Sequence, residues 1–395
     1  MDIRIRYRAI MLMIVIITLT TAATRLHADT GTCGGATTIL PFTDIMGSGF
    51  FCSIAEAYFS GLTNGTSPTT YSPSSNVTRD QMAAFITRTM DQSLKRGSRR
   101  AALKQFWIPT SETGLGLTAV GTMPRVVESD RADLWVANHT GATVSRVRAS
   151  DGRLLETWTG ATSALGVVAA KGLIFVTGDT SPGKLYKVDP AQLAGPVTTV
   201  GISLGDAPQG ISFDGGRIWT ANNGGSVSIV TLSPLAVSTV TAGFIFPIGI
   251  LYDGANIWIT DLGTNPGKLF KLDPNGAIIQ TVTLANDPAF PVFDGTNIWV
   301  PNQTTNTVMV VRASTGVVLA TLTGNGLNQP VTATFDGERV LVTNFNGNSV
   351  SLWKAGDLSP LGSVSTGLAT GPNGACSDGL NFWVTLGLTN QLARF

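Results

Sequence analysis

Histidine and glutamate are scarce in this chain, which limits the chemistry it can perform. Two histidines and five glutamates occur in 395 residues. General acid–base catalysis and metal binding both need grouped side chains of these types, and His139 stands alone in an expected turn. The one acidic pair near the expected centre, Glu128 and Asp130, offers too few oxygen ligands for Ca²⁺. The sequence therefore predicts no catalytic residue, no metal site and no cofactor.

Charge is also scarce. Charged residues make up 13% of the chain and the net charge is +1. A chain without a broad basic surface is not expected to bind nucleic acid. Hydrophobic residues reach 43%, which supports a large core and argues against disorder.

The first residues have the pattern of an export signal. Three arginines, at positions 4, 6 and 8, precede an apolar run at 9–19, and cleavage is expected after Ala23 or Ala28. An uncleaved anchor is the alternative, but the apolar run is short for a spanning helix of about 20 residues. Residues 1–28 are therefore interpreted as a signal peptide. The mature chain is expected to be secreted, to lie in the cell envelope or at the cell surface, and to have no membrane span.

Three cysteines occur, which excludes a disulfide-rich scaffold. An exported chain meets an oxidising compartment, and Cys33 and Cys52 lie in the same short segment. We expect them to form a disulfide, which would contribute about 3 kcal/mol for a loop of this length. Cys376 falls in an expected inner strand, where a buried and inert thiol is predicted.

The segment that contains the first two cysteines has a helix–loop–helix pattern. Apolar spacing predicts a helix from Phe51 to Leu62, ended by Asn64-Gly65. Thr78 and Gln81, three residues apart, predict the N-terminal cap of a second helix.

Four motifs in this segment, in order, resemble those of S-layer homology modules. They are Phe42-Thr43-Asp44, Gly61-Leu62-Thr63-Asn64-Gly65, Tyr71-Ser72-Pro73 and Val77-Thr78-Arg79-Asp80-Gln81. The resemblance implies binding of cell-wall polysaccharide, often pyruvylated, through Asp44, Thr78 and Arg79. The guanidinium of Arg79, near a helix N-terminus, would contact the anionic sugar.

Two departures from the family pattern leave an alternative open. Asp80-Gln81 stands where the family has Ala-Glu, and one module is present where the family usually has three. A structural or assembly role for residues 33–92, with Arg79 bracing the loop, is the alternative. Residues 93–104 are basic and are expected to be a solvated linker, with charge attraction to wall polymer as the other reading.

Residues 105–395 repeat with a period near 41 residues. Each repeat has an anchor residue inside an apolar triplet, and successive anchors lie 39 to 44 residues apart. The anchors are Trp135, Phe175, Trp219, Trp258, Trp299, Leu341 and Trp383. Six repeats have Asp five residues before the anchor and Pro eleven before it, whereas the second has Ala170 and Ala164.

Each repeat reads as four short strands. Pro begins the first strand, and Asp-Gly predicts a type I′ hairpin that leads into the second strand. Asn or Asp three residues after the anchor predicts the turn into the third strand. Four strands in 40 to 45 residues are typical of propeller blades, so the sequence predicts an all-β seven-bladed propeller, with six or eight blades as alternatives. The last repeat lacks a fourth strand, which we assign to residues 104–108 in a three-plus-one closure. The Asp residues are expected to be structural, and the anchor tryptophans to form the core between blades.

The repeats resemble bacterial YVTN/NHL-like propellers. Val340-Leu341-Val342-Thr343-Asn344, followed by Asn348-Ser349-Val350-Ser351-Leu352, carries the likeness. It covers about three quarters of the chain, implies a fold and says little about a ligand.

One position of the repeat varies while its surroundings do not. The residue after each Pro is, in order, Arg125, Leu165, Gln209, Ile248, Ala289, Val331 and Asn373. Arg125, Gln209 and Asn373 are therefore candidate contacts for a protein or glycan, with ordinary loop variation as the alternative.

Together these patterns predict a non-enzymatic envelope protein that binds cell-wall polysaccharide and displays a propeller. The alternatives are an extracellular propeller enzyme of lyase or hydrolase type, acting on a small molecule or glycan, and an assembly scaffold whose N-terminal module oligomerises.

Overall fold

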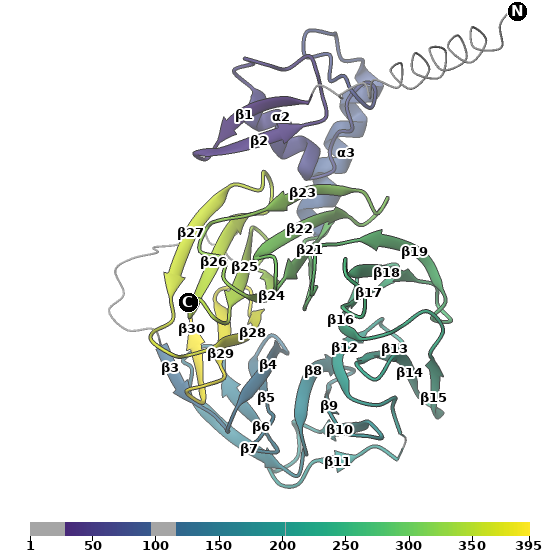
Figure 1. Cartoon of the computed structure of the whole chain (residues 1–395), viewed down its shortest axis with the longest axis vertical. Helices are drawn as coiled ribbons and strands as arrows, with labels where there is room; N and C mark the ends of the chain where they lie inside the picture. Colours follow the sequence, from purple (N-terminus) through teal and green to yellow (C-terminus); the bar gives the residue numbers. More distant parts are fainter. Residues whose placement is uncertain (1–27, 96–115, 202) are drawn as a thin grey trace, which may run out of the picture.

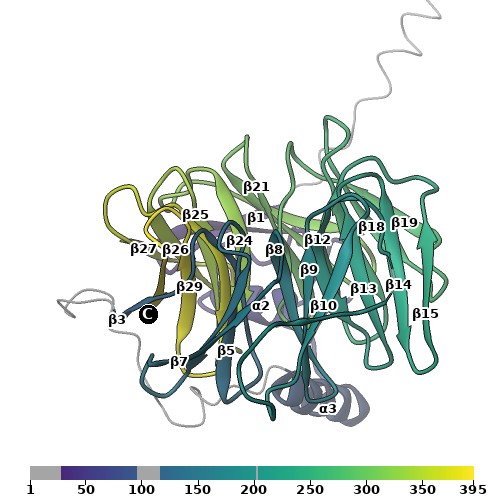
Figure 2. The ribbon, with the colours of Figure 1, turned by 90° about the horizontal axis from the view of Figure 1, so that it is seen from below.

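The computed structural model describes residues 28–95, 116–201 and 203–395. Seven four-stranded antiparallel sheets stand around a central axis, as Figure 1 shows in a view along that axis. The prediction of a seven-bladed propeller is confirmed. In the perpendicular view the strands run between the two faces of the ring (Figure 2).

The blades are numbered one to seven in the order of their inner strands. These are β4 (Pro124–Ser129), β8 (Ala164–Ala170), β12 (Pro208–Phe213), β16 (Pro247–Tyr252), β20 (Val292–Phe293), β24 (Pro330–Phe335) and β28 (Pro372–Ser377). The second strands, which carry the anchors, are β5 (Asp133–Asn138), β9 (Leu173–Gly178), β13 (Arg217–Asn222), β17 (Ile257–Asp261), β21 (Asn297–Asn302), β25 (Arg339–Asn344) and β29 (Phe382–Leu386).

The third strands are β6 (Thr143–Arg148), β10 (Lys184–Val188), β14 (Ser226–Leu232), β18 (Lys268–Leu272), β22 (Thr307–Arg312), β26 (Ser349–Lys354) and β30 (Gln391–Arg394). The outer strands are β7 (Leu154–Thr159), β11 (Thr198–Thr199), β15 (Leu235–Val240), β19 (Ile278–Thr283), β23 (Val318–Leu322), β27 (Pro360–Ser365) and β3 (Gly116–Ala119).

The ring closes three-plus-one, but with a different strand from the one expected. The C-terminal strand β30 pairs with β3, in a register that places Gly116 opposite Arg394. The residues assigned from sequence, 104–108, lie outside the described residues. The physical reason favours β3, because every outer strand leads into the next inner strand through a short loop. The step from Ala119 to Pro124 equals the step from Thr159 to Ala164 in the next blade.

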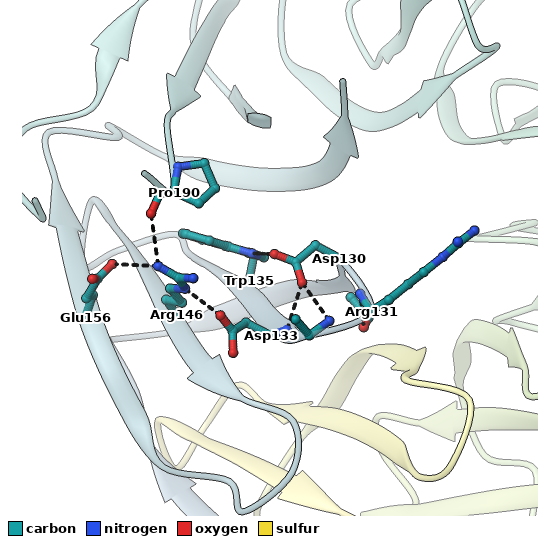
Figure 3. A network of polar contacts seen from close by, with 9 residues as sticks. Asp130, Arg131, Asp133, Trp135, Arg146, Glu156 and Pro190 are labelled. Carbon is teal, nitrogen blue, oxygen red and sulfur yellow. Dashed lines mark hydrogen bonds and ion pairs between the residues drawn. The ribbon is translucent and has the colours of Figure 1, made fainter. Parts of the chain in front are cut away.

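In the five blades that have an anchor tryptophan, the repeated Asp holds both the hairpin and the indole. In blade one, Asp130 Oδ1 accepts hydrogen bonds from the backbone N–H groups of Ala132 and Asp133, and Oδ2 accepts one of 2.8 Å from Trp135 Nε1 (Figure 3). The same indole bond, of 2.7 to 2.9 Å, joins Asp214 to Trp219, Asp253 to Trp258, Asp294 to Trp299 and Asp378 to Trp383. These carboxylates therefore have a structural role, since each joins the hairpin backbone to the buried tryptophan of the same blade.

The two blades without an anchor tryptophan depart from this pattern in a consistent way. Blade two has Ala170 and Phe175, so it lacks both the acceptor and the indole donor. In blade six the anchor is Leu341, and Asp336 Oδ2 instead accepts a bond of 2.7 Å from the buried Arg339.

The hairpin type predicted from Asp-Gly is wrong for most blades. Only the glycine has a positive φ, for example +93° at Gly254, which places it at the first central position as in a type II′ turn. The Asp253 N–H donates to the Asn256 carbonyl, so Asp253 precedes the two central residues, whereas the type I′ rule requires Asp-Gly as the central pair. Two successive positive φ values, as type I′ requires, occur in blade two at Lys171 and Gly172.

The anchor tryptophans form the core between blades, as expected. All five are buried, and each lies in a cluster shared with the following blade: Trp135 with Val167, Trp219 with Ile250, Trp258 with Ile298, Trp299 with Val340, and Trp383 with Val127. Cys376 is a buried free cysteine in blade seven.

The N-terminal module begins with a hairpin that the sequence did not predict. Strands β1 (Asp29–Cys33) and β2 (Ala36–Leu40) pair antiparallel, and helices α2 (Phe51–Phe59) and α3 (Arg79–Lys95) follow. Cys33 and Cys52 form a disulfide that joins β1 to α2. Helix α2 ends earlier than Leu62, because the positive φ of +74° at Gly61 turns the chain there. Helix α3 extends past the expected boundary at 92.

The module packs on blades five and six beside β23 and β27 (Figure 1). Phe42, Ile54 and Phe59 share one core cluster with Trp299 and Trp353. The module and the propeller therefore share one hydrophobic core and are packed against each other.

The C-terminal end of α2 receives donors from blade five. A helix leaves its last carbonyl groups unpaired and carries partial negative charge there. Arg312 donates a bond of 2.6 Å to the Tyr58 carbonyl, and Asn297 donates one of 2.8 Å to the Phe59 carbonyl. Tyr58 also stacks on the guanidinium, with 5.5 Å between that group and the ring centroid.

Candidate functional site

The loops of the ring lie on two faces, because neighbouring strands are antiparallel. The proline face holds the loops that lead into each inner strand and those between second and third strands. The aspartate face holds the Asp hairpins and the loops between third and fourth strands. The module contacts Asn297 and Arg312, so it lies on the aspartate side of blades five and six.

Buried threonines fix the variable positions on the proline face. Two residues after the anchor, Thr385 Oγ1 accepts a bond of 2.8 Å from the Gly374 N–H and donates one of 2.7 Å to the Arg125 carbonyl of the next blade. Equivalent bonds run from Thr177 to Gln209, from Thr260 to Ala289 and from Thr343 to Asn373. In Arg125, Gln209 and Asn373, a threonine of the preceding blade therefore holds the backbone carbonyl, and the side chain remains available to contact a ligand.

These three side chains meet at the mouth of the central channel. A cavity of about 220 Å³ is lined by Arg125, Gln209 and Asn373, together with apolar residues from the other blades. Phe290 and Phe345 add aromatic surface to the same cavity. The sequence prediction thus named residues from blades one, three and seven that the ring brings together.

Arg125 is the charged group at this mouth and is incompletely paired. Its Nε atom is buried and has no hydrogen-bond partner in the structure. Burial lowers the pKa of Arg125, and the nearby Asp179 carboxylate opposes that shift. A guanidinium in this state gains from an anionic or strongly polar ligand, since an unpaired buried donor costs about 1 to 3 kcal/mol.

Asp179 also approaches His139, which the sequence analysis treated as a lone turn residue. His139 Nε2 lies 3.9 Å from Asp179 Oδ2, and both side chains are half-buried. They come from the corresponding loops of blades one and two, forty residues apart, and the packing of one blade on the next brings them together. The sequence signal was the shared loop position, four residues after the anchor in both blades.

Below the mouth lies a deeper chamber of about 330 Å³. Gln209 and Phe290 line both cavities, so the two adjoin. Glu128 lines the chamber, and its removal from water raises its pKa to about 7. Burial, and after it the Glu128 charge, raises the pKa of the adjacent Cys376 thiol well above its ordinary value. The chamber therefore holds a protonatable carboxyl beside an unreactive thiol.

A second hollow, of about 280 Å³, opens on the proline face between blades five and six. Its lining is polar throughout: Asp287, Gln303, Thr304, Asn306, Asn328, Gln329 and Asn346. Gln303 and Gln329 line the channel mouth as well, so the hollow and the mouth adjoin. The sequence analysis missed this site, although the amide-rich loops of the fifth and sixth repeats are visible in the sequence.

On the module, two of the three predicted glycan residues serve the fold. The Asp44 carboxylate accepts bonds of 2.9 and 2.7 Å from the N–H groups of Tyr71 and Ser72. Thr78 and Gln81 form the expected capping box, with the Thr78 N–H donating to Gln81 Oε1 at 2.9 Å. Both residues brace the loop and the start of α3.

The module has a groove of about 560 Å³ between this loop and α3. Gln81, Phe85 and Arg88 line it from the helix, and Arg88 donates a bond of 3.2 Å to the Leu62 carbonyl. These three follow helical spacing, whereas Arg79 stands two residues before Gln81 and points about 200° away around the helix. Arg79 is exposed and is not part of the groove lining. The structure therefore gives the groove a different arginine from the one the motif suggested.

Comparison with known families assigns the N-terminal region. The family model of the S-layer homology domain matches residues 41–83. The chain carries an SLH domain. SLH domains generally bind cell-wall polysaccharide, so this one indicates a protein of the cell surface that is attached to the wall. A search for sequence relatives among curated proteins finds no significant match.

Solved structures resemble the propeller. Hydrazine synthase from Kuenenia stuttgartiensis superposes with a TM-score of 0.60 at 16% identity, over 74% of this chain and 98% of that one. A streptogramin B lyase gives 0.59 at 17% identity, over 70% and 96%. Virginiamycin B lyase from Staphylococcus aureus gives 0.59 at 16% identity, over 70% and 98%. At these identities the likeness shows the propeller fold alone.

No helix in the described part of the chain is long and apolar enough to cross a membrane. The apolar run at 9–19 and the basic linker from residue 96 lie outside the described residues. Among the residues that the structure does describe, no three His, Cys, Asp or Glu side chains lie close enough to hold a metal ion.

Proposed function

We propose that this protein is a secreted, non-enzymatic component of the cell surface. Its SLH domain binds cell-wall polysaccharide, and its propeller presents the proline face to a ligand. The SLH match at residues 41–83, together with the groove of that domain, carries the proposal.

The groove offers the groups that an anionic sugar needs. Arg88 supplies a guanidinium, Gln81 a donor and acceptor, and Tyr71 and Phe85 supply ring surface. Arg79 lies outside the groove, and we assign it no more than an auxiliary charge. The Thr78 hydroxyl bond lowers the pKa of Asp80, so a negative charge stays beside Arg79.

The arrangement of the two parts supports display of the propeller. The module lies against the outer edge of blades five and six, beside β23 and β27 (Figure 1), and none of its residues lines the channel mouth on the proline face. Attachment through the module would therefore not block the propeller ligand site.

The non-enzymatic part of the proposal rests on the chamber. Glu128 is the acidic side chain in its lining, and the adjacent Cys376 thiol is held in its protonated form. An acid–base mechanism needs a second partnered group to receive or supply the proton. The competing function is an enzyme that uses Glu128 alone, and loss of a measured turnover in Glu128→Gln would support it.

Co-sedimentation of the mature full-length protein with native cell-wall sacculi tests the attachment. We expect wild type to pellet and Arg88→Ala to stay mostly in the supernatant, because the groove loses its cation. Arg153→Ala, which removes an exposed arginine of blade one, is the matched control and should pellet like wild type. Arg79→Ala should have the smaller effect of the two module variants.

A truncated propeller is not a suitable control, because the module shares its core with Trp299 and Trp353. If Arg88→Ala and wild type pellet alike, or if wild type does not pellet, wall attachment through this groove is wrong.

A further inference from the structure

We propose that the proline face binds an oligosaccharide that carries a carboxylate. The sugar hydroxyl groups would occupy the polar hollow between blades five and six, and the carboxylate would lie on Arg125. This inference rests on the proposed function, since it names the ligand of the face that the proposed function assigns to binding.

The hollow has the chemistry of a polyol site. Carboxamide side chains both donate and accept hydrogen bonds, and so do sugar hydroxyls. Within the part of the chain that the structure describes, the side-chain amides of Gln303, Asn328 and Asn346 have no hydrogen-bond partner. Asn306 is already oriented, because its Oδ1 accepts a bond of 2.7 Å from the Gln329 N–H. A lining of this kind disfavours an apolar ligand, which could not satisfy the amides.

The hollow is local to blades five and six, which argues for a specific site over a general property of the ring. At the corresponding loops of blade four the side chains are Ile245, Phe246 and Leu262, and the first two are exposed.

The adjoining mouth completes a site for an acidic sugar. Phe290 and Phe345 provide apolar surface for the C–H face of a sugar ring, and Arg125 provides two parallel donors for a carboxylate. Gln303 and Gln329 line both cavities, so one ligand can extend from the hollow to the mouth. The cavities, of about 220 and 280 Å³, together lie in the range of small-ligand sites.

The charge balance selects a carboxylate over a more highly charged phosphate. Asp179 lies near enough to Arg125 to affect its pKa, so it offsets part of the positive potential at the mouth. Asp287 adds a second carboxylate in the hollow, so the one guanidinium at this site suits a ligand with a single negative charge better than one with two. The bond from Thr385 holds the Arg125 backbone in place before the ligand arrives.

Isothermal titration of the mature full-length protein with two matched disaccharides tests the inference. One ends in glucuronic acid, and the other has glucose in its place, so they differ in the carboxylate alone. We expect the acidic disaccharide to bind at least tenfold more tightly to wild type. Arg125→Gln should remove that preference, and Asn346→Ala should weaken both sugars about three- to tenfold.

Asp179→Asn distinguishes an electrostatic role of this carboxylate at the mouth from a purely structural one. Removing the competing charge should tighten binding of the acidic disaccharide and leave the neutral one unchanged. Arg153→Ala should bind both sugars like wild type. Absence of binding of both disaccharides to wild type, equal affinity for the two, or an unchanged preference in Arg125→Gln would each overturn the inference.

The titration contains no wall material, so its failure is distinct from failure of the proposed function. A protein that pellets with sacculi but binds neither disaccharide would keep its wall attachment and lose this assignment.

Discussion

Substitution of Asp253 tests whether the repeated aspartate is a tryptophan clamp or only a turn residue. Its Oδ1 accepts bonds of 2.8 and 2.6 Å from the N–H groups of Ala255 and Asn256, and its Oδ2 accepts one of 2.7 Å from Trp258 Nε1. Trp258 is fully buried, so Asp253→Ala leaves its indole N–H without an acceptor and without access to water.

The expected cost follows from these three bonds. A buried donor without a partner costs about 1 to 3 kcal/mol. The two backbone N–H groups lie in an exposed turn and can bond to water, so their loss adds about 1 kcal/mol. Asp253→Ala should therefore lower the free energy of unfolding by about 2 to 4 kcal/mol, and the melting temperature by about 3 to 7 °C.

Two comparisons isolate the contribution of the indole bond to stability. In both, thermal unfolding is monitored by circular dichroism. Asp273 in the same blade accepts bonds from the N–H groups of Asn275 and Ala277 but holds no tryptophan, so Asp273→Ala should cost only about 1 kcal/mol. In a Trp258→Phe background, Asp253→Ala should also cost about 1 kcal/mol, because phenylalanine has no N–H group that would lose its acceptor.

Blade two is the natural version of that double variant, with Ala170 and Phe175 at the same positions. If Asp253→Ala costs as much in the Trp258→Phe background as in the wild-type background, the coupling is absent. The clamp would then be refuted, and the aspartate would be a turn residue alone.

Three further predictions concern single sites. Arg131 has a φ of +81° where five other blades have glycine, so Arg131→Gly should stabilise the protein by about 1 kcal/mol in thermal denaturation. The folded-state pKa of Glu128 is raised from 4.5 to about 7, so stability is lost as pH rises through that window. Glu128→Gln should match wild type near pH 5 and exceed it by about 3 kcal/mol at pH 8 in urea titrations; equal pH profiles would contradict this. Replacing Cys33 and Cys52 with serine should lower the free energy of unfolding by about 3 kcal/mol, and added reductant should then have no further effect.

The sequence was sufficient for features that depend on local spacing. The anchors, the Asp and the Pro recur in fixed register, and each blade must satisfy the same packing on its neighbour, so the repeat predicts the propeller. The capping box at Thr78 and Gln81 is equally local, since both partners lie within one turn.

Features that depend on competition between similar segments were harder to predict. Either of two segments before the first blade could supply the closing strand, and only the short loop to Pro124 selects Gly116–Ala119. The prediction of the hairpin type was wrong for a related reason, because pairing of Asp253 with Asn256 shifts Asp-Gly by one position relative to the centre of the turn.

The sequence by itself determined the blades, the core between them, and which positions vary from blade to blade. Tertiary structure alone decided which of those positions meet: Arg125 with Asn373 at the mouth, where blades one and seven are neighbours, and His139 with Asp179, where blade one packs on blade two. It also decided that the module shares a core with blades five and six. The physical reason is that periodic packing is a property of each repeat, whereas a site formed by loops forty or more residues apart exists only once the blades have packed on one another and, for blades one and seven, once the ring has closed.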